Sequence, residues 1–171
     1  MITDETNRPG RKKTDQPALE ISTLQRREIQ SPLVACLIRE FIIELGQDKA
    51  MEVASAAIQR DAMEAGKMMA VNYGGNSMKE LVRLVKEGWA EADALELTIL
   101  EETDQRLSFD VTRCRYAELY DRLNIKEFGY CLSCNRDAPL IKSFNPRMKL
   151  LRTQTIMQGA KICDFRIILE E

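Results

Sequence analysis

The spacing of apolar residues changes once along this chain, near Ala94, and this change limits the possible folds. Before Ala94, apolar residues recur every three or four positions, which is the period of a helix that buries one face. From Leu95 to Val111 they alternate with polar residues, which is the period of a half-buried strand. Helices followed by hairpins predict an α+β fold. We therefore expect N-terminal helices packed on an antiparallel sheet of roughly four strands.

Three helices are predicted before the change of period. Ser31-Pro32 is typical of a helix start, with serine as N-cap and proline at the first helical position, and Gly46 is typical of a helix end. An alanine-rich helix follows over residues 47–71, and Ser77 to Glu80 has the capping-box pattern of a third. Because apolar residues surround the first helix, we expect it to be covered on more than one side, with Cys36 buried.

Two hairpins with a helical insert between them are predicted after the change of period. The first hairpin pairs residues 95–99 with residues 107–111 around a polar turn. The insert covers residues 115–145, and one helical face carries Tyr116, Leu119, Tyr120 and Leu123.

The second hairpin lies in the run Leu150 to Glu171, where two apolar-rich segments flank the turn candidate Gln158 to Lys161. Symmetrical pairing about that turn predicts two faces, because side chains alternate along a strand. One face carries Leu151, Asp164, Arg166 and Ile168, and the other carries Arg152, Cys163, Phe165, Ile167 and Leu169. An arginine on either face needs an anionic partner, either Asp164 or the carboxylate of a ligand.

Length and charge define the class of protein. Residues 1–22 have almost no apolar content and a basic cluster, which predicts a disordered tail, and residues 23–171 are enough for a single domain. With 25 basic and 27 acidic residues the formal charge is −2, so we expect no nucleic-acid partner and no membrane partner. The N-terminus lacks the apolar stretch of a signal peptide, which predicts a cytoplasmic protein.

The absence of histidine restricts the chemistry most. It excludes an imidazole base and leaves carboxylates, thiols and water to move protons. Five cysteines without a secretory signal indicate free thiols or metal ligands instead of disulfides. Cys131 and Cys134 have the spacing of a metal knuckle, but the other cysteines stand singly, so no metal ligands are assigned and the cofactor stays open.

Two cysteines are the better candidates for a nucleophile. Cys114 lies between Arg113 and Arg115, whose charges could lower its pKa if they turn toward the thiol, and Cys134 is the other candidate. Cys163 precedes Asp164, which has the opposite tendency. The alternative for each cysteine is a small buried apolar residue.

Short motifs along the C-terminal half carry a family resemblance. They are, in order, Arg113-Cys114, Cys134-x-x-Asp137, Phe144-x-Pro146, Leu151-Arg152-Thr153-x-Thr155 with Gly159, and Cys163-Asp164-Phe165. Together they resemble the L-2-amino-thiazoline-4-carboxylic acid hydrolase family over residues 94–171, with a looser helical half before them.

The resemblance implies a hydrolase that opens a carbon–nitrogen bond of a small carboxylate-bearing cyclic amidine, such as L-2-amino-thiazoline-4-carboxylate. It implies a catalytic set of Cys114, Cys134, Asp137 and Asp164, with a cysteine as nucleophile or water-orienting group and an aspartate as proton carrier. It implies a substrate-binding set of Arg113, Arg152, Thr155 and Cys163. Of these, Arg113 or Arg152 would hold the carboxylate. The expected partner is a small-molecule substrate, and a homo-oligomer is compatible with the sequence.

A function of another class stays open. The ending Gly159-x-x-x-Cys163-x-Phe165 is also similar to 4-vinyl reductase-like ligand-binding domains, which implies a non-catalytic small-molecule-binding or sensory domain. In both cases we expect Cys114, Cys134 and Cys163 to converge near Asp137.

Overall fold

The computed structural model describes residues 21–170, so the predicted tail lies outside the described residues except for its last two positions. The helices are α1 (Thr23–Leu45), α2 (Gln47–Asn72), α3 (Met78–Arg83), η1 (Leu84–Trp89), η2 (Glu91–Asp93), α4 (Arg115–Arg122), α5 (Lys126–Leu132), η3 (Cys134–Arg136), α6 (Asp137–Phe144) and η4 (Ile156–Gln158). The strands are β1 (Leu95–Glu102), β2 (Arg106–Cys114), β3 (Met148–Leu151) and β4 (Cys163–Leu169). This order confirms the α+β fold with a helical insert.

The first helix begins earlier than predicted. The side chain of Ser22 accepts the N–H of Gln25, and the side chain of Gln25 accepts the N–H of Ser22, so a capping box starts α1 at Thr23. Pro32 therefore lies inside the helix, and the predicted start at Ser31-Pro32 is wrong. Gly46, with φ of 79°, ends α1 as predicted and leads directly into α2.

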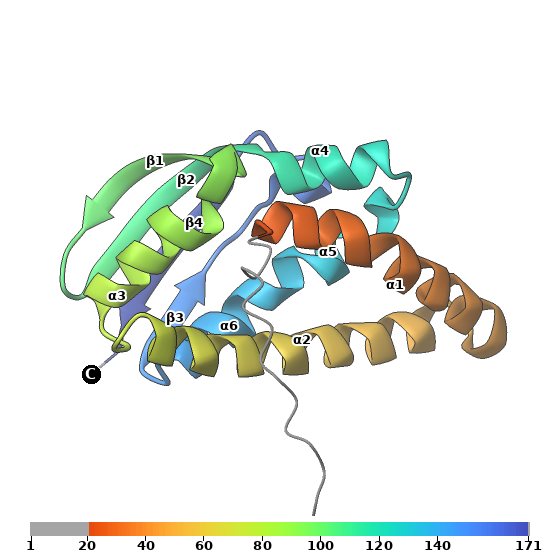
Figure 1. The fold of residues 1–171 in the computed structure, drawn as a ribbon, viewed down its shortest axis with the longest axis horizontal. Helices are drawn as coiled ribbons and strands as arrows, with labels where there is room; N and C mark the ends of the chain where they lie inside the picture. Colours follow the sequence, from red (N-terminus) through yellow and green to blue (C-terminus); the bar gives the residue numbers. More distant parts are fainter. Residues whose placement is uncertain (1–20, 171) are drawn as a thin grey trace, which may run out of the picture.

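Four antiparallel strands form one sheet in the order β1-β2-β4-β3. Helices α2, α3 and α6 pack on one face of it, and Figure 1 shows α3 crossing in front of the strands. Phe109 of β2 lies opposite Phe165 of β4, and their rings stack with centroids 4.8 Å apart.

A second hydrophobic cluster lies beside the first one. It is formed mainly by α1, α4 and α5, which Figure 1 shows gathered at the end of the molecule away from the sheet. The predicted face of α4 is confirmed, since Tyr116, Leu119 and Tyr120 are buried. Helix α2 contributes to both clusters, and Leu95, Cys114 and Ile156 are packed against both of them. The interior therefore has a junction at these three residues.

The last two strands pair as predicted but without the predicted turn. Leu151 lies opposite Arg166, which keeps both on one face, and Cys163, Phe165 and Ile167 are buried on the other. The prediction of a tight turn at Gln158 to Lys161 is wrong, because residues 152–162 form a longer connection that contains η4. Asp164 holds this connection, since its carboxylate accepts the N–H groups of Thr153 and Gln154 at 3.0 and 2.9 Å.

Helix α3 continues into a π-helix, η1. Within it the N–H of Ala90 donates to the carbonyl of Val85 at 3.1 Å, a bond that spans five residues. Trp89 ends this segment, and its ring meets Phe165 edge-on with centroids 6.0 Å apart. None of the described helices is both long and apolar enough to cross a membrane.

Candidate functional site

A buried ion pair lies near the junction of the two hydrophobic clusters. Asp137 is the first residue of α6, and Arg152 follows β3. The guanidinium of Arg152 donates to the Asp137 carboxylate and, at 3.0 Å, to the carbonyl of Cys134. The side chains of Arg152 and Asp137 are 8% and 21% exposed. Arg152 was predicted to need an anionic partner, and that partner is Asp137, not Asp164.

An aromatic ring supports this arginine. The guanidinium carbon of Arg152 lies 4.9 Å from the ring centroid of Phe165. Phe165 is itself fixed between Phe109 and Trp89. A cation over an aromatic face is attracted by the ring, and more strongly where water is excluded. The orientation of Arg152 is therefore supported by β2, β4 and η1, while Asp137 is placed by the start of α6.

Protonation of the pair reflects its burial. Loss of solvent raises the pKa of Asp137, and the charge of Arg152 opposes that rise. For Arg152, burial is the largest single influence and acts to lower the pKa, but the charge and hydrogen bond of Asp137, together with smaller contributions, outweigh it and the pKa is raised. A carboxyl whose pKa is raised above its ordinary value is better suited to take up a proton.

Three thiols lie within electrostatic range of Asp137. These are Cys114, Cys134 and Cys163, and the charge of Asp137 acts to raise the pKa of each of them. Burial raises the pKa of all three, for Cys114 to about 11. Cys163 also accepts the N–H of Ile156 at 3.2 Å. At neutral pH the thiols are therefore protonated, and none is an activated thiolate.

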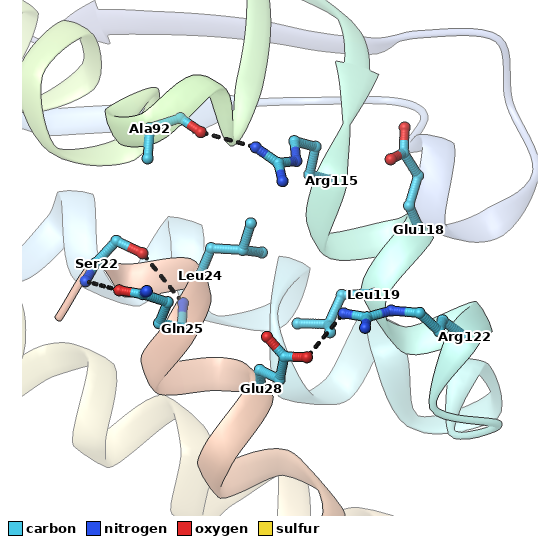
Figure 2. A pocket seen from close by; sticks show the side chains of 9 residues that line it. All are labelled: Ser22, Leu24, Gln25, Glu28, Ala92, Arg115, Glu118, Leu119 and Arg122. Atoms are coloured by element: carbon cyan, nitrogen blue, oxygen red, sulfur yellow. Dashed lines mark hydrogen bonds and ion pairs between the residues drawn. The ribbon is translucent and has the colours of Figure 1, made fainter.

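The condition under which Arg113 and Arg115 could lower the pKa of Cys114, that their side chains turn toward the thiol, is not met. Arg113 lies on the surface and pairs with Glu118 at 2.7 Å and Glu96 at 3.3 Å. Arg115 donates to the carbonyl of Ala92 at 2.9 Å, as Figure 2 shows. Both guanidinium groups turn away to these partners, so burial decides the pKa of Cys114.

Two further arginines reach the same region. Arg136 of η3 is buried, and its guanidinium pairs at 2.7 Å with Asp61 of α2, whose side chain is 70% exposed. Arg27 lies on the side of α1 that faces the core, between Leu24 and Ser31. The charges of Arg27 and Arg136 both act on Asp137. Polar groups thus extend from the solvent-exposed Asp61 to the buried Asp137.

Arg27 has an environment that an arginine on a packed helix face rarely has. Burial, and next the charge of Arg136, lower its pKa, while the Tyr120 and Tyr116 hydroxyls act in the opposite direction. Among residues 21–170, no hydrogen bond or ion pair to its guanidinium is found. Arg27 was not among the predicted site residues, because the predicted helix start was Ser31. With α1 starting at Thr23, the spacing Leu24, Arg27, Ser31, Ala35 would have shown it.

The other predicted site residues have structural contacts. Although burial acts to raise it, hydrogen bonds from Thr153 and Gln154 lower the pKa of Asp164. Thr155 is buried and caps η4, where its hydroxyl accepts the N–H of Gln158 at 3.2 Å. Cys131 is buried against Ser55, with 3.5 Å between sulfur and oxygen. In the described part of the chain, no group of three or more acidic or thiol side chains is arranged to hold a metal ion.

A hollow lies elsewhere, between the start of α1 and α4. It measures about 630 Å³ and is drawn in Figure 2. Some of the charged residues that line it pair with one another: the guanidinium of Arg122 lies 2.8 Å from the carboxylate of Glu28. The three thiols, Asp137 and Arg152 are not among its lining residues. We therefore base the candidate site on the buried polar cluster.

The unfolding free energy at alkaline pH should depend on the raised pKa of the buried Cys114 thiol. Its pKa is about 11 in the folded protein against an ordinary value of 9.0, so folding favours the protonated thiol. This contribution is present below pH 9 and is lost as pH rises toward 11, by about 3 kcal/mol in total. We expect the unfolding free energy, measured with urea, to fall more over this pH range in wild type than in Cys114→Ala. Equal pH slopes in the two proteins would contradict the burial of this thiol.

Comparisons with known proteins support the fold and the family motifs. The profile of L-2-amino-thiazoline-4-carboxylic acid hydrolase matches residues 26–167. The phenol-responsive sensory domain of the transcription activator PoxR, solved with phenol, has a TM-score of 0.52 at 10% identity, over 82% of this chain and 74% of that one. A trafficking protein particle complex subunit 3 from Naegleria fowleri, covalently bound to palmitic acid, has a TM-score of 0.50 at 12% identity, over 84% and 97%. At such identities the likeness shows the fold alone. No curated protein matches the sequence.

Proposed function

Because the chain belongs to the L-2-amino-thiazoline-4-carboxylic acid hydrolase family, we propose that it hydrolyses a carbon–nitrogen bond of a small carboxylate-bearing cyclic amidine. L-2-amino-thiazoline-4-carboxylate is the substrate that the family description supplies. The observation that carries the proposal is the buried Asp137–Arg152 pair within range of three protonated thiols. It combines a proton carrier with a site that is largely closed to solvent.

The reaction adds one water molecule to the ring. The oxygen of water bonds to the ring carbon between nitrogen and sulfur, and the bond from that carbon to the ring nitrogen breaks. Both protons of the water end on the released nitrogen. Asp137 takes the first proton as water attacks and returns it to the departing nitrogen. Arg152 is a positioning residue, because both sides of its guanidinium are used by Asp137 and the Cys134 carbonyl.

The thiols have a role as orienting groups in this scheme. A thiol with a pKa near 11, such as Cys114, is almost wholly protonated at neutral pH and is a poor nucleophile. We therefore assign the attack to water. Cys114 and Cys134 contact the water or the ring as weak hydrogen-bond donors and exclude other solvent.

The substrate carboxylate needs a cation with free donors, and Arg27 supplies one. Its guanidinium lies within range of Asp137 but has no partner among residues 21–170. Arg113, the other predicted anchor, is on the surface with two glutamates. A guanidinium can hold a carboxylate through two parallel hydrogen bonds.

Replacement of Arg27 should therefore affect binding more than turnover. We expect Arg27→Met to raise KM for the amino-thiazoline carboxylate by about 10- to 100-fold, the loss of one charge-assisted contact. Arg27→Lys should be intermediate, because it keeps the charge without the planar pair of donors. Arg60→Met, a change of an exposed arginine on α2, is the matched control and should leave KM unchanged. An equal response of Arg27→Met and Arg60→Met would remove the anchor role.

Binding without turnover is the second candidate function. One observation favours it: the three thiols have raised pKa values, so no nucleophile is activated in the free protein. The fold also occurs in a sensory domain whose structure holds phenol. In that case the same buried cluster would bind a small carboxylate and report its presence.

Turnover of the amino-thiazoline carboxylate by purified protein decides between the two functions. Release of a primary amine is followed in wild type with and without a chelator, and ligand binding is measured in parallel by calorimetry. Turnover that persists in chelator and scales with protein supports the hydrolase with a water nucleophile. Tight binding with no amine release would support the binding domain instead.

A further inference from the structure

Helix α1 has a second apolar face that is largely exposed in the described structure. Ile29, Leu33, Leu37 and Phe41 are 68%, 67%, 48% and 40% exposed. At about 100° per residue they occupy one sector of the helix, roughly 120° wide. The opposite side, with Ser31, Ala35 and Ile38, is buried in the second cluster. Large apolar side chains gathered on one exposed face mark an interaction surface more often than isolated ones do.

Charges at the two ends of this face are of opposite sign. Arg26 lies at its N-terminal end and Glu44 at its C-terminal end, and both are exposed. By helical spacing both fall on the same line as Leu33 and Leu37, along the middle of the face. Glu40, which is also exposed, falls within the same sector, between the lines of Ile29 and Leu33. The face is therefore basic at its N-terminal end, mainly apolar in the middle, and acidic toward its C-terminal end.

This arrangement is complementary to itself when reversed. Consider a rotation of α1 by 180° about an axis that is perpendicular to the helix, level with Ala35, and passes through the middle of the apolar face. It exchanges the positions of Arg26 and Glu44, of Ile29 and Phe41, and of Leu33 and Leu37. A surface with this property suits a two-fold axis, at which the same patch meets itself. The opposite charges at the two ends are the observation that favours a second copy of this chain over another partner.

We propose that α1 packs antiparallel against α1 of a second copy of this chain. The two-fold axis would pass between the two helices at the level of Ala35. The Leu33 and Leu37 side chains of the two copies interdigitate at the centre, and Arg26 of each copy pairs with Glu44 of the other. Cys36, predicted to be buried, is exposed at the edge of the same face. Its position next to the axis brings the two Cys36 thiols to the same side of the interface, about 3 Å apart along the helix axis.

The mass of the protein in solution tests the proposal. We expect sedimentation of wild type to give a dimer at micromolar concentration, and Leu33→Glu/Leu37→Glu to give a monomer with unchanged circular dichroism. Val71→Glu, a change of an exposed valine at the end of α2, is the control and should stay dimeric. A monomeric wild type, or a double variant that is still dimeric, would overturn it.

Two further measurements test the orientation of the helices. A short bismaleimide should link two chains of wild type and fail with Cys36→Ser. Arg26→Glu and Glu44→Arg should each raise the dimer dissociation constant, by about 3- to 10-fold for a partly exposed ion pair, and the combined exchange should restore it. A dimer that does not cross-link would rule out the antiparallel contact. So would a combined variant whose dissociation constant is raised by the sum of the two single effects on binding free energy.

Discussion

Replacement of Asp137 by asparagine is expected to lower kcat for the amino-thiazoline carboxylate by about 10²- to 10⁴-fold, the usual contribution of a general base. Asparagine keeps the size and can still accept a hydrogen bond from Arg152, but it cannot take a proton from water. Because the lost interaction belongs to the transition state, kcat should fall while KM changes little. Initial rates over a range of substrate concentrations measure the two constants.

Asp110→Asn is the matched control for this variant. Asp110 also pairs with an arginine, Arg166, at 2.9 Å, but this pair lies on β2 and β4 without the thiols. The same chemical change there should leave kcat within about twofold of wild type. A similar loss in both variants would point to general destabilisation, and full activity in Asp137→Asn would remove Asp137 from the reaction.

Replacement of Arg152 by methionine is expected to cost about 3–5 kcal/mol of unfolding free energy, because it leaves the Asp137 carboxylate buried without its counter-charge. The contact with Phe165 is lost as well. Urea unfolding followed by circular dichroism measures the change. Arg166→Met should cost about 1 kcal/mol or less, because Arg166 is partly exposed and its carboxylate partner can be hydrated.

A double variant separates the two parts of that loss. Arg152→Met/Asp137→Leu removes both charges, so no buried charge stays unpaired, and it should recover most of the stability lost in Arg152→Met. It should nevertheless be inactive, because the proton carrier is gone. A double variant less stable than Arg152→Met would show that packing around the pair, and not the unpaired charge, sets the cost.

Local patterns predicted the elements of this fold well. The alternation after Ala94 gave the first hairpin, and the glycine at position 46 and the capping box at Ser77 gave helix ends. The start of α1 was wrong because two start signals compete. Ser22 and Gln25 form the capping box that is used, while Ser31-Pro32 is the more conspicuous pattern.

Contacts between distant segments could not be predicted from the same patterns. The partner of Arg152 depends on the path of residues 152–162, which β4 fixes through Asp164. Cys36 was expected in the core because apolar spacing shows that a face is apolar but not what covers it. Whether Arg113 turns toward Cys114 depends on Glu118, which lies on the next helix.

The π-helix η1 affects which changes in chain length this fold can accept. A π-helical turn holds about one residue more than an α-helical turn of similar rise. Deletion of one residue between Leu84 and Trp89 should therefore leave an ordinary α-helix, with α3 and β1 still connected. Because the extra residue is taken up within the wider π-helical turn, the deletion would leave Trp89 in nearly the same orientation relative to α3, with its ring still near Phe165. Relatives that are one residue shorter in this segment should therefore keep an aromatic residue at this position, behind Arg152.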